Sequence, residues 1–171
     1  TTYRQFEVRV DPYLIAGDSS SGVLPTIQDE PLGTPGDGDR RIQAYCFRLC
    51  LTEDPHNRIP FSRPDDYDPA LYEIYRRYVQ AGGQLWRPNA RLPNGKTDQG
   101  SWHDLSANLY GMNHDYPEGS YATRERIYRE HLSFTQGLLY FLTQDSALPE
   151  DLRREWSQWG TCRDEFQDNG G

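Results

Sequence analysis

The strongest constraint on the fold is a long segment with helical periodicity, residues 121–143. Apolar side chains recur there at intervals of three or four residues and form one stripe that includes Ile127, Phe134 and Leu138. Ser120 precedes the segment and is a typical helix N-cap. A helix of this kind must bury its stripe against other elements, so the sequence predicts a domain built around one long helix.

Two shorter helices are predicted, one before and one after this segment. Asp68 and Pro69 are typical of a helix start, apolar side chains follow at helical spacing, and Gly82 marks the end. Pro149 is expected to open a third helix that closes at Gly160.

Two segments alternate as strands do. In residues 4–10, Phe6, Val8 and Val10 fall on one face. The alternation is strongest in residues 42–52, where small residues and Arg48 share one face and large apolar residues share the other. Both segments are therefore expected to belong to a small sheet.

The remaining chain is punctuated by Gly, Pro, Ser and Asp, above all in residues 11–41 and 87–119. Long segments of this kind inside a domain are usually functional, and their apolar residues indicate that they pack in order. We therefore predict an α+β fold in which a small sheet is covered by three helices and two long ordered loops. The chain is expected to be a single domain, with a strand-and-loop part (1–64) and a mainly helical part (65–171).

Charge and composition exclude some functions. The chain has 18 Lys and Arg against 26 Asp and Glu, a net charge of −8, so it lacks the basic surface that nucleic acid requires. It contains no run of about 18 apolar residues, so we expect no membrane span. The only methionine is Met112, which predicts a chain processed or excised from something longer.

Common cofactor and metal motifs are absent from the sequence. Cys46, Cys50 and Cys162 lack zinc-site spacing, and the first two are too far apart along one strand to bridge, so free thiols are expected. No Lys-Ser/Thr follows the glycines of residues 17–22, and neither G-x-G-x-x-G nor H-E-x-x-H occurs. We predict neither a metal site nor a dinucleotide site in this chain.

The clearest candidate site is the segment 111–119, which directly precedes the long helix. His114 and Asp115 could act there as general acid or base, close to a helix N-terminus that favours anions. The alternative is a turn whose Asn and Asp side chains only cap backbone groups.

Two further polar residues have alternative interpretations. Arg48 either forms a surface ion pair or points into a cleft, where its guanidinium could hold a carboxylate or phosphate. His131 lies on the apolar stripe of the long helix and is expected to be a hydrogen-bonded core histidine.

Four segments together resemble the middle portion of a bacterial family of FAD-dependent oxidoreductases, distantly akin to the fumarate reductase flavoproteins. They are AYCFRLCLT (44–52), GMNHDYPEG (111–119), YATRERIYREHLSFTQGLLYFL (121–142) and WGTCRDEFQDNGG (159–171). The resemblance implies that FAD belongs to the full-length protein, bound by an N-terminal glycine motif that this chain lacks. It implies further that the chain is an excised substrate or cap region, with no cofactor on the fragment and no activity alone.

Such enzymes pass a hydride between a small-molecule substrate and the flavin, so the resemblance implies a substrate site here. From their chemistry, Arg48 is the candidate holder of an anion or carbonyl, and Asn113 and Tyr116 are further candidate substrate-binding residues. His114 or Asp115 is the candidate proton acceptor. The missing FAD-binding domain is the expected partner, and dimerisation is expected through the surface that its removal bares.

A carbohydrate-binding or glycosidase-like module is the alternative function. Sugars could stack on aromatic residues, namely Trp86, Trp102, Tyr110 and Tyr116. Two of three acids, Asp104, Asp115 and Glu118, would then have to face each other across a cleft, about 5 to 9.5 Å apart. A helical module that docks on its FAD domain is a third option.

Overall fold

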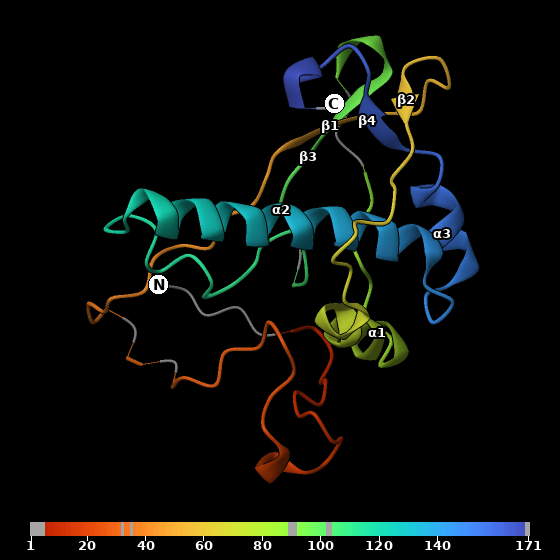
Figure 1. The fold of residues 1–171 in the computed structure, drawn as a ribbon. Helices are drawn as coiled ribbons and strands as arrows, with labels where there is room; N and C mark the ends of the chain where they lie inside the picture. The colour runs from red at the N-terminus through yellow and green to blue at the C-terminus, as the bar shows by residue number, and fades with distance from the viewer. Residues whose placement is uncertain (1–5, 32, 35, 89–91, 102–103, 170–171) are drawn as a thin grey trace.

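The structure, a computed structural model, describes residues 6–31, 33–34, 36–88, 92–101 and 104–169. Its centre is helix α2 (Tyr121–Gln144), which begins where the hydroxyl of Ser120 accepts the Thr123 N–H, as predicted. Helix α1 (Glu73–Gln80) lies on one side of α2, and α3 (Glu150–Trp156) packs near its C-terminal end (Figure 1). A sheet lies on the side of α2 opposite α1.

The sheet has four short strands in the order β2-β4-β1-β3. They are β1 (Leu49–Thr52), β2 (Arg58–Ile59), β3 (Lys96–Gln99) and β4 (Gly160–Cys162). Every pairing between them is antiparallel, and Leu51 in β1 is opposite Thr97 in β3 and Thr161 in β4. A small sheet with three helices confirms the predicted α+β class.

Short 3-10 helices connect these elements. They are η1 (Ser19–Ser21), η2 (Pro69–Tyr72), η3 (Pro93–Gly95) and η4 (Gln167–Asn169). The η2 turn leads into α1 and begins as predicted, because the Asp68 carboxylate accepts the Ala70 N–H at 2.9 Å. The chain leaves α1 through Gly82, whose φ of +91° is a conformation that favours glycine.

The core centres on Tyr72, which joins η2 to the middle of α2. Its ring stacks on Phe134 and Phe141, and its hydroxyl donates to the Phe134 carbonyl at 2.9 Å. A Cβ at Gly137 would overlap the Tyr72 hydroxyl, so this approach requires glycine within α2. The apolar stripe of α2 is therefore buried against an aromatic cluster.

The expected strand at residues 4–10 is wrong, because its described residues 6–10 are irregular. Burial still alternates, and Phe6 packs edge-on against Tyr78 with ring centroids 5.4 Å apart. The Glu7 N–H, however, donates to the Asp104 carboxylate at 2.7 Å instead of to a neighbouring strand. Alternation alone does not make a strand, and none of the four described strands pairs with residues 6–10.

The expected strand at residues 42–52 is correct only in its last four residues, β1. Upstream, Tyr45 makes an isolated bridge to Leu109, because the chain runs there against a loop instead of a strand. Conversely, the expected loop 87–119 contains β3, which is short, polar and weakly β-forming in composition.

The third helix ends earlier than expected, at Trp156, and Gly160 does not close it but begins β4. A Cβ at Gly160 would overlap the Ile59 carbonyl of β2, so this glycine allows two strands to approach. The long loop 11–41 is ordered over its described residues: Leu24 is buried, and the Arg77 guanidinium donates to the Tyr13 carbonyl at 2.7 Å.

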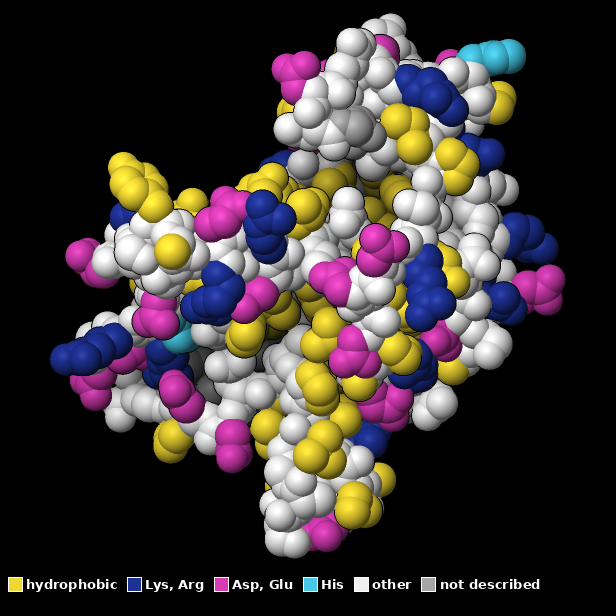
Figure 2. All heavy atoms as spheres, in the orientation of Figure 1, with side chains coloured by type: hydrophobic (Ala, Val, Ile, Leu, Met, Phe, Trp, Pro, Cys, Tyr) yellow, Lys and Arg dark blue, Asp and Glu magenta, His cyan; other side chains and the backbone are white. Residues whose placement is uncertain are grey.

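The surface is mixed in charge. Figure 2 shows acidic and basic side chains interspersed over one face, with no broad area of a single sign. Within the described part of the chain, no helix combines the length and apolar character needed to cross a membrane.

Candidate functional site

The segments 42–45 and 109–116 are held together by three hydrogen bonds. The Asn113 amide donates to the Gln43 carbonyl at 2.7 Å, and the Ile42 N–H donates to His114 Nδ1 at 3.2 Å. The Leu109 N–H and the Tyr45 carbonyl are 3.5 Å apart. Two segments that are distant in the sequence are thus joined, and together they form the clamp.

A residue near the start of α2 contacts the C-terminal end of the 109–116 segment. The Arg124 guanidinium donates to the carbonyls of Tyr116 at 3.0 Å and Pro117 at 2.7 Å. The loop itself turns through Gly111 at a φ of +75° and closes with a hydrogen bond from the Tyr116 N–H to the Asn113 carbonyl. The residues on which the sequence interpretation centred are therefore fixed in place by backbone contacts.

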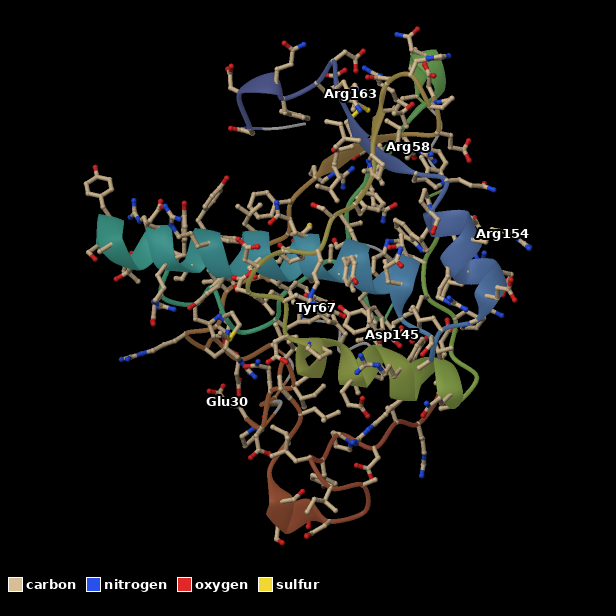
Figure 3. The ribbon with its side chains drawn as sticks, turned by 45° about the vertical axis from the view of Figure 1, so that its right-hand side comes forward. Glu30, Arg58, Tyr67, Asp145, Arg154 and Arg163 are labelled. Carbon is tan, nitrogen blue, oxygen red and sulfur yellow. The ribbon has the colours of Figure 1, made fainter. Side chains whose placement is uncertain are left out.

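A polar cavity of about 530 Å³ lies beside the clamp. It is lined by Gln28, Glu30, Asp37, Asp39, Arg41, Ile42, Gln43, Ala44, Tyr110, Gly111 and His114. Figure 3 labels Glu30 on the N-terminal loop. Three of the lining residues are acids and one is an arginine, so the described walls carry a net negative charge.

The one lining arginine is already paired. The Arg41 guanidinium donates to the Asp39 carboxylate at 2.6 Å, and the Arg41 N–H donates to the same group at 2.9 Å. These hydrogen bonds lower the pKa of Asp39, so its carboxylate stays ionised. The cavity is consequently better suited to an uncharged polar molecule than to an anion.

His114 is half-buried in this cavity, and its Ile42 contact determines its tautomer. A backbone N–H can only donate, so Nδ1 must carry the lone pair, and the neutral ring then carries its proton on Nε2. In this arrangement the ring donates a hydrogen bond. Nε2 can accept a proton only in the other neutral tautomer, in which Nδ1 carries the hydrogen. In that tautomer Nδ1 could no longer accept the Ile42 N–H, so this hydrogen bond would be lost.

The other predicted site residues are not all brought to this cavity. Asn113 is fully buried and its Oδ1 has no hydrogen-bond partner, whereas Asp115 is exposed. Arg48 forms an exposed ion pair with Asp98 of β3, which is the surface arrangement that the sequence left open. Tyr116 lines a different, smaller pocket.

That smaller pocket has a volume of about 260 Å³ and is lined mainly by aromatic rings. Its lining residues are Tyr45, Cys46, Phe47, Tyr116, Ile127, Tyr128 and His131. His131 is 5% exposed, and its Nδ1 lies 2.8 Å from the Ile127 carbonyl, so the prediction of a hydrogen-bonded core histidine is confirmed. Sequence reasoning missed that His131 also lines a pocket; the shared face of Tyr45 and Phe47 was the available signal.

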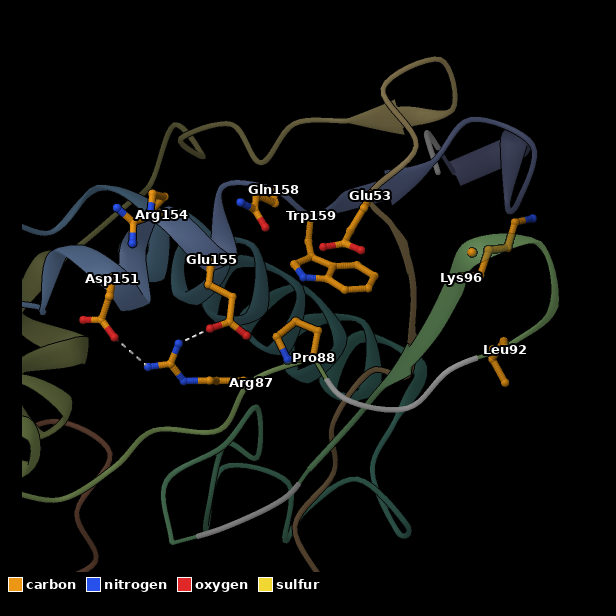
Figure 4. Close-up of a pocket in the computed structure, with 11 residues that line it drawn as sticks. Glu53, Arg87, Pro88, Leu92, Lys96, Asp151, Arg154, Glu155, Gln158 and Trp159 are labelled. Atoms are coloured by element: carbon orange, nitrogen blue, oxygen red, sulfur yellow. Dashed lines mark hydrogen bonds and ion pairs between the residues drawn. The ribbon is translucent and has the colours of Figure 1, made fainter.

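A larger surface cleft of about 880 Å³ separates α3 from the β1–β3 edge. Figure 4 shows its Arg87 side chain between Asp151 and Glu155, both on α3, with which it forms ion pairs. The Arg87 contact lowers the pKa of Asp151. Because two carboxylates already occupy the arginine, this cleft offers an anion little at that position.

Other kinds of site find less support. Among the described residues, no group of three or more His, Cys, Asp or Glu side chains could hold a metal ion. For a sugar site, Trp86 is 2% exposed and packs on Trp156, so it is a core residue. Asp104 is buried and accepts from the Tyr78 hydroxyl, and Trp102 lies outside the described residues.

Comparison with known proteins gives one finding. The family model described as "FAD dependent oxidoreductase" matches residues 5–170, almost the whole chain. Searches of the curated proteins and of the solved structures find no match.

Proposed function

This chain belongs to the family of FAD-dependent oxidoreductases, and from that premise we propose that it is the substrate-side part of such an enzyme. The polar cavity beside His114 is the proposed substrate site. The observation that carries the proposal is the clamp, which ties segment 111–119, one of those that resemble the family, to the residues just before segment 44–52, and positions His114 at the cavity wall.

The residues described here do not fit the dinucleotide part of FAD. That part is held by a glycine-rich turn between a strand and a helix of a parallel sheet. The described strands pair only in antiparallel fashion, and none of them leads through such a turn into a helix. We therefore assign the binding of FAD to other segments of the complete protein, which are the proposed partner of this chain.

The charges of the cavity disfavour an anion. We propose a small uncharged substrate with hydroxyl or carbonyl groups, which can accept a hydrogen bond from His114. The Nε2–H of His114 would donate to a substrate oxygen and so orient the substrate, while Asn113 holds the loop in position. Asp115 does not line this cavity, so we assign it no role in proton transfer there.

The test uses the complete flavoprotein and the variant His114→Asn. The amide oxygen of asparagine can still accept the Ile42 N–H, but the distal donor is lost. Anaerobic flavin reduction is measured by absorbance with neutral polyols and sugars as probes, and with dicarboxylates for comparison. We expect neutral probes to reduce the flavin, and the variant to slow this step at least about tenfold.

The matched control is Tyr121→Ser, at a side chain that is 90% exposed on the first residue of α2. It should reduce its flavin at the original rate. The proposal is wrong if the complete protein binds no flavin, or if His114→Asn reduces it as fast as the control.

A further inference from the structure

The aromatic pocket beside α2 has the construction of a ligand site. Two edge-to-face ring pairs line it, Tyr45 with Tyr116 at 5.5 Å between centroids and Phe47 with Tyr128 at 5.4 Å. In each pair one ring comes from the chain leading into β1, and the other comes from the clamp loop or from α2. The rings that line the pocket are therefore already fixed in place by packing against each other.

The Tyr116 ring, which lines the pocket, is also held by the charged side chain of Arg124. The Arg124 guanidinium lies 5.7 Å from the centroid of the Tyr116 ring, and the same side chain donates to the Tyr116 carbonyl. A ring held at both its face and its backbone loses little further freedom when a ligand binds, so less of the binding energy is spent on ordering it.

Of the residues that line this pocket, His131 has a buried polar atom without a hydrogen-bond partner. Its Nδ1 lies 2.8 Å from the Ile127 carbonyl, which can only accept, so Nδ1 is the protonated nitrogen of the neutral ring. Nε2 then carries a lone pair, is buried, and has no hydrogen-bond partner. An unpaired buried acceptor costs free energy, which a donor on a ligand would recover.

Size and charge narrow the ligand class. The pocket volume of about 260 Å³ exceeds the roughly 150 Å³ of a cavity that accommodates benzene. None of its lining residues is Lys, Arg, Asp or Glu, so nothing there pairs with a charged ligand. A quaternary ammonium ion would find aromatic faces but would leave Nε2 without a donor.

We propose that this pocket binds a small uncharged aromatic group that carries one hydrogen-bond donor, of the phenol type. The ring of the ligand packs among Tyr45, Phe47, Tyr116 and Tyr128, and its hydroxyl donates to Nε2 of His131. The site is separate from the polar cavity, and the proposal does not depend on the flavin or on the proposed substrate.

The test compares 4-methylphenol with toluene, which differs by the hydroxyl group, on the 171-residue chain without flavin. Binding is followed by NMR through the His131 ring nitrogens and the ring protons of the pocket. In His131→Phe, the ratio of the toluene Kd to the 4-methylphenol Kd should fall roughly three- to tenfold, the value of one hydrogen bond. Toluene itself should bind the variant at least as tightly.

A second variant keeps the test valid if His131→Phe does not fold. Tyr128 is 45% exposed, so Tyr128→Ala should fold and should weaken both probes while leaving their ratio unchanged. The proposal is overturned if neither probe binds, if the ratio is the same in His131→Phe, if Tyr128→Ala changes neither affinity, or if tetramethylammonium binds more tightly than 4-methylphenol.

Discussion

Asn113 and Gln43 are 70 positions apart, yet the Asn113 amide donates to the Gln43 carbonyl at 2.7 Å. Asn113 is completely buried, and the next residue, His114, accepts the Ile42 N–H. This pair joins the chain that leads into β1 to the loop that precedes α2. The clamp therefore links the chain that leads into the sheet to the wall of the polar cavity.

Replacing Asn113 by Ala should lower the free energy of unfolding by about 2 kcal/mol. The substitution removes the donor, leaves the Gln43 carbonyl unpaired and opens a small cavity. Urea denaturation followed by circular dichroism measures the change. Asn169→Ala, at an exposed asparagine, is the control and should stay within about 0.5 kcal/mol. Equal effects of the two variants would contradict the clamp.

Replacing Asp145 by Asn should reduce stability at neutral pH by about 1–2 kcal/mol. Asp145 follows α2 and pairs with Arg76 of α1 at 2.6 Å, and Figure 3 labels it near α1. Burial acts to raise the pKa of Asp145, but hydrogen bonds from Arg76 and from the Ala147 N–H outweigh it, so the pKa is lowered.

The pH dependence of this pair has a definite sign. Because the pKa of Asp145 is lower in the folded state, the carboxylate stabilises the fold fully above the unfolded-state value of about 4. That stabilisation disappears as the pH falls through the folded-state pKa. Denaturation at several pH values should show a smaller loss in Asp145→Asn than in the original protein below about pH 4. Parallel curves would contradict the assignment.

Cys162 should resist alkylation in the folded protein. It is fully buried in β4 with its sulfur 3.8 Å from that of Cys50, and burial together with this neighbour raises the pKa of the Cys162 thiol to about 12. At pH 8 the reactive thiolate is therefore scarce. Iodoacetamide labelling mapped by mass spectrometry should modify Cys162 only after denaturant is added. Modification of folded Cys162 as fast as half-buried Cys46 would refute this expectation.

Replacing Gly137 by Ala should destabilise the protein, although the same change inside an exposed helix normally stabilises by about 1 kcal/mol. The new Cβ would overlap the Tyr72 hydroxyl and displace its hydrogen bond to the Phe134 carbonyl. We expect a loss of about 1–3 kcal/mol in thermal and urea unfolding. Gly38→Ala, where nothing lies within 4 Å, is the control. A gain in stability from Gly137→Ala would contradict this prediction, because it would mean that Tyr72 can move away from the new methyl group without loss.

The elements that could be predicted from sequence are those defined by neighbours in the chain. The cap at Ser120, the start at Asp68 and the break at Gly82 each act within one helical turn, and all three lie as expected. His131 was likewise placed correctly in the core by its position on a helical stripe.

The strands were less predictable because a strand depends on a distant partner. β3 has a polar sequence and exists because it lies along β1. Residues 6–10 alternate well, but none of the described strands pairs with them, and the Glu7 N–H donates to Asp104 instead. Gly160 has the appearance of a helix end, but the approach of Ile59 requires it. In the candidate site, the loop and its polar residues were predictable, but their division between two cavities was not.

The sequence by itself determined an acidic α+β chain organised around one long helix, and it contains the segments that mark the family. Only the tertiary structure decided that Arg48 pairs with Asp98, that His114 and Tyr116 line different cavities, and that His131 has an unpaired nitrogen beside an aromatic pocket. The physical reason is that helix signals are short-range, whereas each of these contacts joins residues that become neighbours only when loops close. The hydrogen bond between Asn113 and Gln43 is the clearest of them.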